Sequence, residues 1–140
     1  MSVVLLDTHV WLWSVHGDVR RIGRRTRQLL SRAEAQGALR VSPASLFELT
    51  ALHALGRIRL SRAPEQWIRD SFDAGLRLAE LSPTVAIDAG RISRTALADP
   101  LDRLLVATAR DLDSTFLTSD TRILEYASKT GDVRVHNASV

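Results

Sequence analysis

VVLLDTHVWLW, residues 3–13, is the stretch on which the fold depends. Residues 3–6 form an apolar run of the kind that makes a short strand buried on both faces. A single acid, Asp7, follows this run directly, and residues 9–15 have the composition of a short helix. A buried strand that leads straight into a helix opens a βα unit, and ligands bind just beyond the carboxyl ends of such strands.

The rest of the chain repeats this alternation of short apolar runs and helical patterns. Further strands are expected at residues 39–41, 78–81, 115–118 and 133–136. Helices are expected at residues 18–37, 43–56, 63–76, 84–94, 100–111 and 122–127. This order predicts a three-layer α/β/α sandwich around a mostly parallel sheet of four or five short strands. Residues 1–140 have the length of a single domain.

The composition is that of a globular protein in a reducing compartment. Of 140 residues 45% are apolar and 25% charged, and there is no cysteine to form a disulfide or a thiolate metal site. The N-terminal apolar run lacks the features of a signal peptide, and no apolar stretch approaches the roughly 20 residues that cross a bilayer. We therefore expect a cytoplasmic protein that does not enter a membrane.

The basic residues are almost all arginine, since Lys129 is the only lysine. The net charge is +3 and the isoelectric point is about 10.5. Arginine binds two phosphate oxygens at once through its planar fork, which gives a slight preference for a nucleic-acid partner. Genomic base composition explains the same bias equally well.

Two acids directly follow predicted strands. Asp7 comes after residues 3–6, and Asp120 comes one residue after the strand expected at 115–118. Both therefore lie at the carboxyl edge of the sheet if the strands are parallel. Each is also a good N-cap for the helix that follows, so capping remains open as the reason for its presence.

Two further positions carry acids that need a partner. Glu48 lies on a helix that is apolar nearly all round, and no base stands three or four residues away. A buried, unpaired carboxylate is costly, so Glu48 should pair with a distant arginine, take up a proton or bind a metal. In ADPLDR, residues 98–103, Asp99 is the expected N-cap, and Asp102 in the first turn suits both the helix dipole and a crevice.

Three or four carboxylates at one edge of a sheet repel one another unless a cation lies among them. Oxygen ligands without cysteine or paired histidines suit a hard ion, Mg²⁺ or Mn²⁺. Such an ion can activate water and neutralise charge on a phosphoryl group. The sequence therefore favours a metal-dependent phosphodiesterase site.

Four blocks of sequence resemble the PIN-domain family, in particular the VapC-like toxins of type II toxin–antitoxin pairs. They are LLDTHVWLW (5–13), VSPASLFEL with LGRIRL (41–49 and 55–60), DPLDRLLVATA (99–109) and FLTSDTRILEY (116–126). The resemblance implies a Mg²⁺- or Mn²⁺-dependent endoribonuclease with an α/β/α fold. It also implies a homodimer that is silenced by a cognate antitoxin protein.

The resemblance assigns roles to individual residues. The four acids that hold the metal and support catalysis would be Asp7, Glu48, Asp102 and Asp120. Asp99 ranks below them and would help through a water molecule. Thr118 matches the small hydroxyl residue before the last acid, which it would orient, and it also ranks among the weaker candidates for substrate binding.

Arginines supply the remaining candidates for RNA contact. Arg20, Arg21, Arg24 and Arg25 fall at i, i+4 spacing on the helix expected at 18–37, where like charges repel. An RNA backbone would relieve this repulsion, and Arg20 and Arg24 are the residues singled out, although a solvated basic face explains the pattern as well. Arg103, next to Asp102, is the single residue best placed for a phosphate contact.

Other functions fit less well. A phosphatase of the haloacid dehalogenase type would need an aspartate two residues after Asp7, where this chain has His9. The alternative that stays open is a non-catalytic RNA-binding or protein-interaction module whose acids only cap helices.

Overall fold

The computed structural model describes residues 2–140. The strands are β1 (Val4–Leu6), β2 (Leu39–Val41), β3 (Arg77–Leu78), β4 (Thr115–Thr118) and β5 (Val135–Asn137). The helices are α1 (Thr8–His16), α2 (Arg24–Ala35), α3 (Pro43–Ala54), α4 (Pro64–Asp73), α5 (Pro83–Arg91), α6 (Pro100–Asp111) and α7 (Thr121–Thr130). None of the helices among residues 2–140 has the length and hydropathy to cross a membrane.

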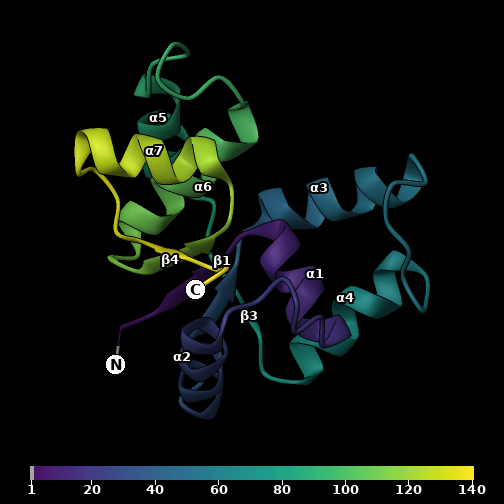
Figure 1. Ribbon diagram of the computed structural model, residues 1–140. Helices are drawn as coiled ribbons and strands as arrows, with labels where there is room; N and C mark the ends of the chain where they lie inside the picture. The colour runs from purple at the N-terminus through teal and green to yellow at the C-terminus, as the bar shows by residue number, and fades with distance from the viewer. Residues whose placement is uncertain (1) are drawn as a thin grey trace.

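The five strands form one sheet in the order β3-β2-β1-β4-β5, and every pair is parallel. β1 is the central strand, with Leu6 in register with Leu117 of β4 and Val4 in register with Leu39 of β2. The predicted parallel α/β fold is confirmed, at the upper end of the expected strand number (Figure 1).

Helices cover both faces of the sheet because successive side chains of a strand point to opposite sides. Val4 and Leu6 pack with buried residues of α1, α2 and α4. Leu5 and Phe116 pack with buried residues of α6 and α7 on the other face. α5 packs on α6, and α3 projects to one side of the molecule (Figure 1).

The helix predicted from residue 18 begins only at Arg24, so this prediction is wrong for residues 18–23. These residues form a turn after α1, which ends at Gly17 in a left-handed conformation. Ile22 is buried, but it lies in this turn and not in a helix. Its distance of three residues from Val19 matches the spacing of a helix, and this match led to the wrong prediction. The arginine pairs 20/24 and 21/25 therefore do not share a helix.

The other boundaries shift by up to three residues. Helix α7 runs to Thr130 and is longer than expected, whereas α4 ends at Asp73, since Gly75 turns the chain with φ of +113°. The third strand is Arg77–Leu78, not residues 78–81, and the last is Val135–Asn137.

The C-terminal segment is attached to the start of α2. Gly23 N donates to Ala138 O over 2.8 Å, and the fully buried Thr26 donates through Oγ1 to Val140 O over 3.0 Å. Thr26 Oγ1 also lies 2.9 Å from Nε2 of His136. A Cβ at position 23 would overlap the backbone of Val140, so any other residue there would have to displace the C-terminal segment.

Candidate active site

Asp7 is held at both of its carboxylate oxygens. It caps α1, with Oδ1 accepting a hydrogen bond from Thr8 N over 2.8 Å, and Oδ2 accepts one from Thr118 Oγ1 over 2.6 Å. Burial raises the pKa of Asp7, the bonds from Thr118 and Thr8 lower it, and the charge of Glu48 raises it further. Each oxygen keeps a lone pair that these bonds do not use.

Pairing of β1 with β4 brings Asp120 to the same edge of the sheet as Asp7. Asp7 N donates to Leu117 O over 3.0 Å, which continues the pairing beyond β1. Thr118 is fully buried, and its hydroxyl accepts from Asp120 N over 3.0 Å while it donates to Asp7. The Thr118 side chain therefore joins the first and last acids. Asp120 also caps α7 through Oδ1, which accepts from Arg122 N.

Asp102 is a buried acid, with 8% of its surface exposed. It lies in the first turn of α6, and among residues 2–140 no hydrogen bond or ion pair reaches its carboxylate. Burial is the largest cause that raises its pKa to about 7, and the remaining causes are all negative charges. Those charges belong to Asp99, Asp120, Asp7 and Glu48.

Glu48 lies half-buried on α3. Within the described part of the chain its carboxylate has neither an ion pair nor a hydrogen bond, so the distant arginine considered from the sequence does not reach it. Its charge raises the pKa values of both Asp7 and Asp102, so it lies close to them. Asp99 caps α6 through Oδ1, which accepts from Leu101 N over 2.9 Å.

Only one of the three arginine candidates adjoins the acids in sequence. Arg103 follows Asp102 on α6 and is half-buried, and its buried Nε–H finds no acceptor among residues 2–140. Arg20 and Arg24 are exposed in the turn before α2 and at its start. No hydrogen bond or ion pair in the described chain links these two side chains to the acids.

The donor set fits a hard divalent cation, because it consists of carboxylate oxygens that no protein cation neutralises. In the present arrangement the acids share a region without closing into a ligand cluster. No group of three His, Asp or Glu side chains between residues 2 and 140 lies close enough to hold a metal as it stands. Binding would require rotamer changes, which the partly exposed side chains of Glu48 and Asp120 can make.

The sequence did not reveal a hydrogen bond behind these acids, from Thr8 Oγ1 to Ser45 Oγ over 2.9 Å. Thr8 directly follows Asp7, and Ser45 precedes Glu48 by three residues. The only available signal was the presence of small hydroxyl residues at these two places, which also occur at many ordinary helix starts.

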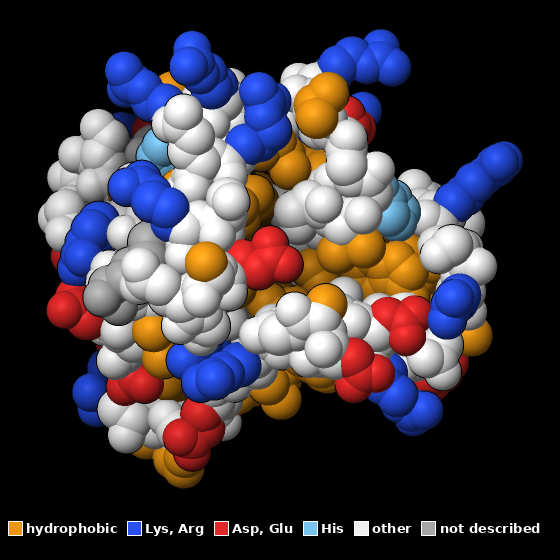
Figure 2. Space-filling model, turned by 90° about the horizontal axis from the view of Figure 1, so that it is seen from below, with side chains coloured by type: hydrophobic (Ala, Val, Ile, Leu, Met, Phe, Trp, Pro, Cys, Tyr) orange, Lys and Arg blue, Asp and Glu red, His pale blue; other side chains and the backbone are white. Residues whose placement is uncertain are grey.

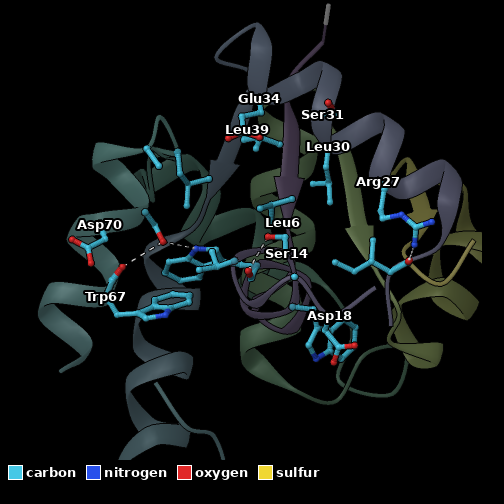
Figure 3. Close-up of a pocket in the computed structure, with 18 of the residues that line it drawn as sticks. Leu6, Ser14, Asp18, Arg27, Leu30, Ser31, Glu34, Leu39, Trp67 and Asp70 are labelled. Carbon is cyan, nitrogen blue, oxygen red and sulfur yellow. Dashed lines mark hydrogen bonds between the residues drawn. The ribbon is translucent and has the colours of Figure 1, made fainter. Parts of the chain in front are cut away.

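A separate cavity of about 590 Å³ lies among α1, α2 and α4 and contains none of the candidate acids. Its walls include Leu6, Leu30 and Leu39, and charged residues such as Asp18 and Arg27 stand beside them (Figure 3). Seen from below, the molecule has a hollow lined with apolar side chains and bordered by charged ones (Figure 2). Sequence periodicity does not predict such a cavity, because it depends on the packing of α4 against α1 and α2, which come much earlier in the chain.

Comparison with known proteins adds an independent line of support. The family model of the PIN domain matches residues 4–129. Ribonuclease VapC22 of Mycobacterium tuberculosis is 31% identical over 123 residues, which cover 88% of this chain and 91% of that protein.

Solved structures share the fold. DNA-bound VapBC from Salmonella typhimurium matches with a TM-score of 0.67 at 20% identity, over 97% of this chain and 98% of the other. VapBC2 from Rickettsia felis, bound to a promoter DNA fragment, matches with a TM-score of 0.69 at 15% identity, over 96% and 98%. The resemblance inferred from the four sequence blocks is thereby confirmed: the chain belongs to the PIN domain family.

Proposed function

We propose that this protein is a Mg²⁺- or Mn²⁺-dependent endoribonuclease that acts as the toxin of a type II toxin–antitoxin pair in the cytoplasm. The observation that carries the proposal is the environment of Asp102, a buried acid without a protein partner whose pKa is raised to about 7 by burial and by four neighbouring acids. Such a concentration of negative charge at the carboxyl edge of a parallel sheet suits a cation and a phosphodiester.

Asp7, Glu48, Asp102 and Asp120 would hold the cation, with Asp99 in a weaker role. When bound, the cation would supply the positive charge that activates a water molecule and stabilises the phosphoryl oxygens. Thr118 and the Thr8 amide fix Asp7 so that its free lone pairs keep one direction. A bound cation would lower the pKa of Asp102, because its positive charge would offset both burial and the four neighbouring acids, so that Asp102 would bind it as a carboxylate.

Arg103 would complete the site on the substrate side. Arg103 is half-buried and makes no ion pair in the described chain, and the exposed part of its guanidinium would bind a phosphate oxygen of RNA. The Arg103→Lys variant keeps the charge and loses the planar fork, so we expect weaker RNA binding with little change in metal affinity. Equal RNA affinity of this variant and the parent protein would remove Arg103 from the site.

The exposed arginines Arg20 and Arg24 would bind the RNA backbone without reading its sequence. Replacing both by serine should reduce the slope of log affinity against log salt by about 0.7 for each phosphate that is no longer neutralised. An unchanged slope would mean that Arg20 and Arg24 do not contact RNA and only form a solvated basic surface.

The decisive experiment is cleavage of total RNA and transfer RNA by the purified protein in Mn²⁺, in Mg²⁺ and in EDTA. The Asp7→Asn variant is run alongside, with Asp73→Asn as the matched control because Asp73 is an exposed acid at the end of α4. We expect metal-dependent cleavage by the parent and by the control, and none by Asp7→Asn. Cleavage in EDTA, or full activity of folded Asp7→Asn, would refute the proposal.

The non-catalytic alternative has one observation in its favour. Asp7, Asp99 and Asp120 all cap helices, and capping alone accounts for an aspartate at each of these positions. Capping does not account for Glu48 or Asp102, which accept no backbone hydrogen bond in the described chain. Variants of these two acids therefore distinguish a nuclease from a binding module.

The antitoxin would cover the cavity among α1, α2 and α4. The support is its apolar lining and the exposed Val15 and Val19 at its edge, since exposed apolar hollows of this kind are typical of protein interfaces. One of the matched solved structures is a toxin–antitoxin complex from Klebsiella pneumoniae. An antitoxin that copurifies with the parent protein should bind Val19→Asp at least about tenfold more weakly, and equal affinity would exclude this site.

The homodimer would use α3. Phe47, Ala51 and Leu55 follow one another at intervals of four residues and so share one face of this helix. Phe47 and Leu55 are 66% and 68% exposed, which leaves an apolar face without a partner in the described chain. A second copy of the chain would bury it.

A further inference from the structure

Thr8 and Ser45 form a buried hydrogen bond between the two helices that follow Asp7 and carry Glu48. Thr8 Oγ1 donates to Ser45 Oγ over 2.9 Å, and the two residues are 1% and 0% exposed. They lie 37 residues apart in sequence. A buried hydroxyl that loses its partner is left unsatisfied, which is unfavourable, so each of these residues depends on the other.

Both ends of this bond lie next to an acid of the site. The backbone N of Thr8 donates to Asp7 Oδ1 over 2.8 Å while its side chain reaches α3. Ser45 precedes Glu48 by three residues, which places the two on the same side of α3. The Thr8–Ser45 bond therefore links α1 to α3 at positions next to Asp7 and one helical turn before Glu48.

The Thr8–Ser45 bond is the most direct link between the helices that hold Asp7 and Glu48. Thr118 ties Asp7 to Asp120, but the Glu48 carboxylate has no hydrogen bond in residues 2–140. In the same part of the chain, the Thr8–Ser45 bond is the one side-chain hydrogen bond between α1 and α3. Apolar contacts between helices are non-directional and let them slide, whereas two carboxylates that approach one another repel.

We propose that Thr8 and Ser45 are positioning residues that set the separation of Asp7 and Glu48 for a divalent cation. This inference rests on the proposed function, in which these two acids hold the metal. Hydrogen-bonded groups behind metal ligands typically change metal affinity by 10–100-fold when they are removed. Neither hydroxyl is expected to touch substrate.

The test measures Mn²⁺ binding by titration calorimetry, without RNA, for the parent protein and its variants. Thr8→Val keeps the shape and removes the hydroxyl, and we expect its Mn²⁺ affinity to fall by about tenfold. Ser45→Ala should have the same effect, and the double variant should be no worse than either alone because both remove one bond. Thr8→Ser retains the hydroxyl and should restore the parent affinity.

Thr108→Val is the matched control. Thr108 is also 1% exposed, and its hydroxyl donates to Leu104 O within α6 over 2.7 Å, so this variant loses a buried hydroxyl but leaves the bond between α1 and α3 intact. We expect it to lower the melting temperature without changing Mn²⁺ affinity. Ser45→Ala supplies a second variant if Thr8→Val does not fold.

The outcomes separate this inference from the proposed function. If the parent binds Mn²⁺ and folded Thr8→Val or Ser45→Ala binds it equally well, the positioning role is wrong and the proposed function stands. Equal weakening by Thr108→Val would mean that the loss is only structural. A parent protein that binds neither Mn²⁺ nor Mg²⁺ would overturn both.

Discussion

Asp102 combines burial with the charges of four other acids, and this combination makes its ionisation unfavourable in the metal-free protein. Its pKa is about 7 in the folded chain, against an ordinary value of 3.8 that applies when the chain unfolds. Between these values the folded state holds a proton that the unfolded state has lost. The free energy of unfolding therefore falls as pH rises through this range, and the loss is complete above about pH 7.

The Asp102→Asn variant should lose this pH dependence. In EDTA we expect it to melt at nearly the same temperature as the parent protein near pH 4.5, and to be more stable at pH 8 by on the order of 2–4 kcal/mol. The measurement is thermal unfolding of both proteins at several pH values. With Mn²⁺ present the order should reverse, since only the parent gains binding energy. Parallel curves for both proteins in EDTA would contradict the raised pKa.

The Glu48→Gln variant tests whether Glu48, which does not cap a helix, is a metal ligand. We expect a fall in metal-dependent RNA cleavage by roughly a hundredfold or more with an unchanged fold, because the amide removes one negative metal ligand. Cleavage rates and far-UV circular dichroism check this expectation. Glu65→Gln on the exposed side of α4 is the control and should cleave normally. Full activity of folded Glu48→Gln would support the non-catalytic module.

At the scale of residues, the sequence supplied the candidate acids but not the contacts that hold them. Asp7 and Asp120 could be found because each follows a strand, and Glu48 because it stands on an apolar helix without a partner. The double role of the Thr118 hydroxyl and the Thr8–Ser45 bond could not be found. Both depend on contacts between segments 37 to 111 residues apart, and local patterns do not record such contacts.

At the scale of elements, the start of α2 is fixed by the C-terminal segment and not by its own sequence. Gly23, which precedes the helix, packs directly against the backbone of Ser139 and Val140. This contact explains why a helical pattern from residue 18 did not produce a helix there. The strand-to-helix order was predictable, whereas a boundary that depends on a distant segment was not.

Gly23→Ala should loosen this contact. A Cβ there would overlap the C-terminal backbone, and we expect the protein to lose about 1–3 kcal/mol of stability. Gly90→Ala is the matched control, because Gly90 lies inside α5 with open space around the position of a Cβ. Alanine should stabilise that helix by about 0.5–1 kcal/mol. Denaturant unfolding measures both, and a Gly23→Ala protein as stable as the parent would show that the segment yields at little cost.

At the scale of the whole molecule, the parallel fold class could be predicted and the strand order could not. The strands are two to four residues long, and their sequences are too short to specify which strands pair. The strand order β3-β2-β1-β4-β5 depends instead on how the helices pack on both faces of the sheet. The cavity among α1, α2 and α4 could not be predicted from the sequence either. It depends on how three helices lie relative to one another.

The proposed homodimer can be tested at this scale. The parent protein should sediment with twice the mass of its 15.5 kDa chain. Leu55→Arg adds a charge to the exposed apolar face of α3, and a basic residue suits the C-terminal end of a helix. We expect this variant to sediment as a monomer with its fold intact. A parent protein that is already monomeric, or a Leu55→Arg dimer, would exclude α3 as the interface.

The pairing of β1 with β4 also bears on how the protein is made. Asp7 is synthesised more than a hundred residues before Thr118 and Asp120. A growing chain on the ribosome cannot assemble the acids at one edge of the sheet until β4 has emerged and paired with β1. Under the proposed function, every truncated translation product that ends before β4 is harmless to the RNA around it. Under the same function, toxicity is therefore confined to chains that extend through β4.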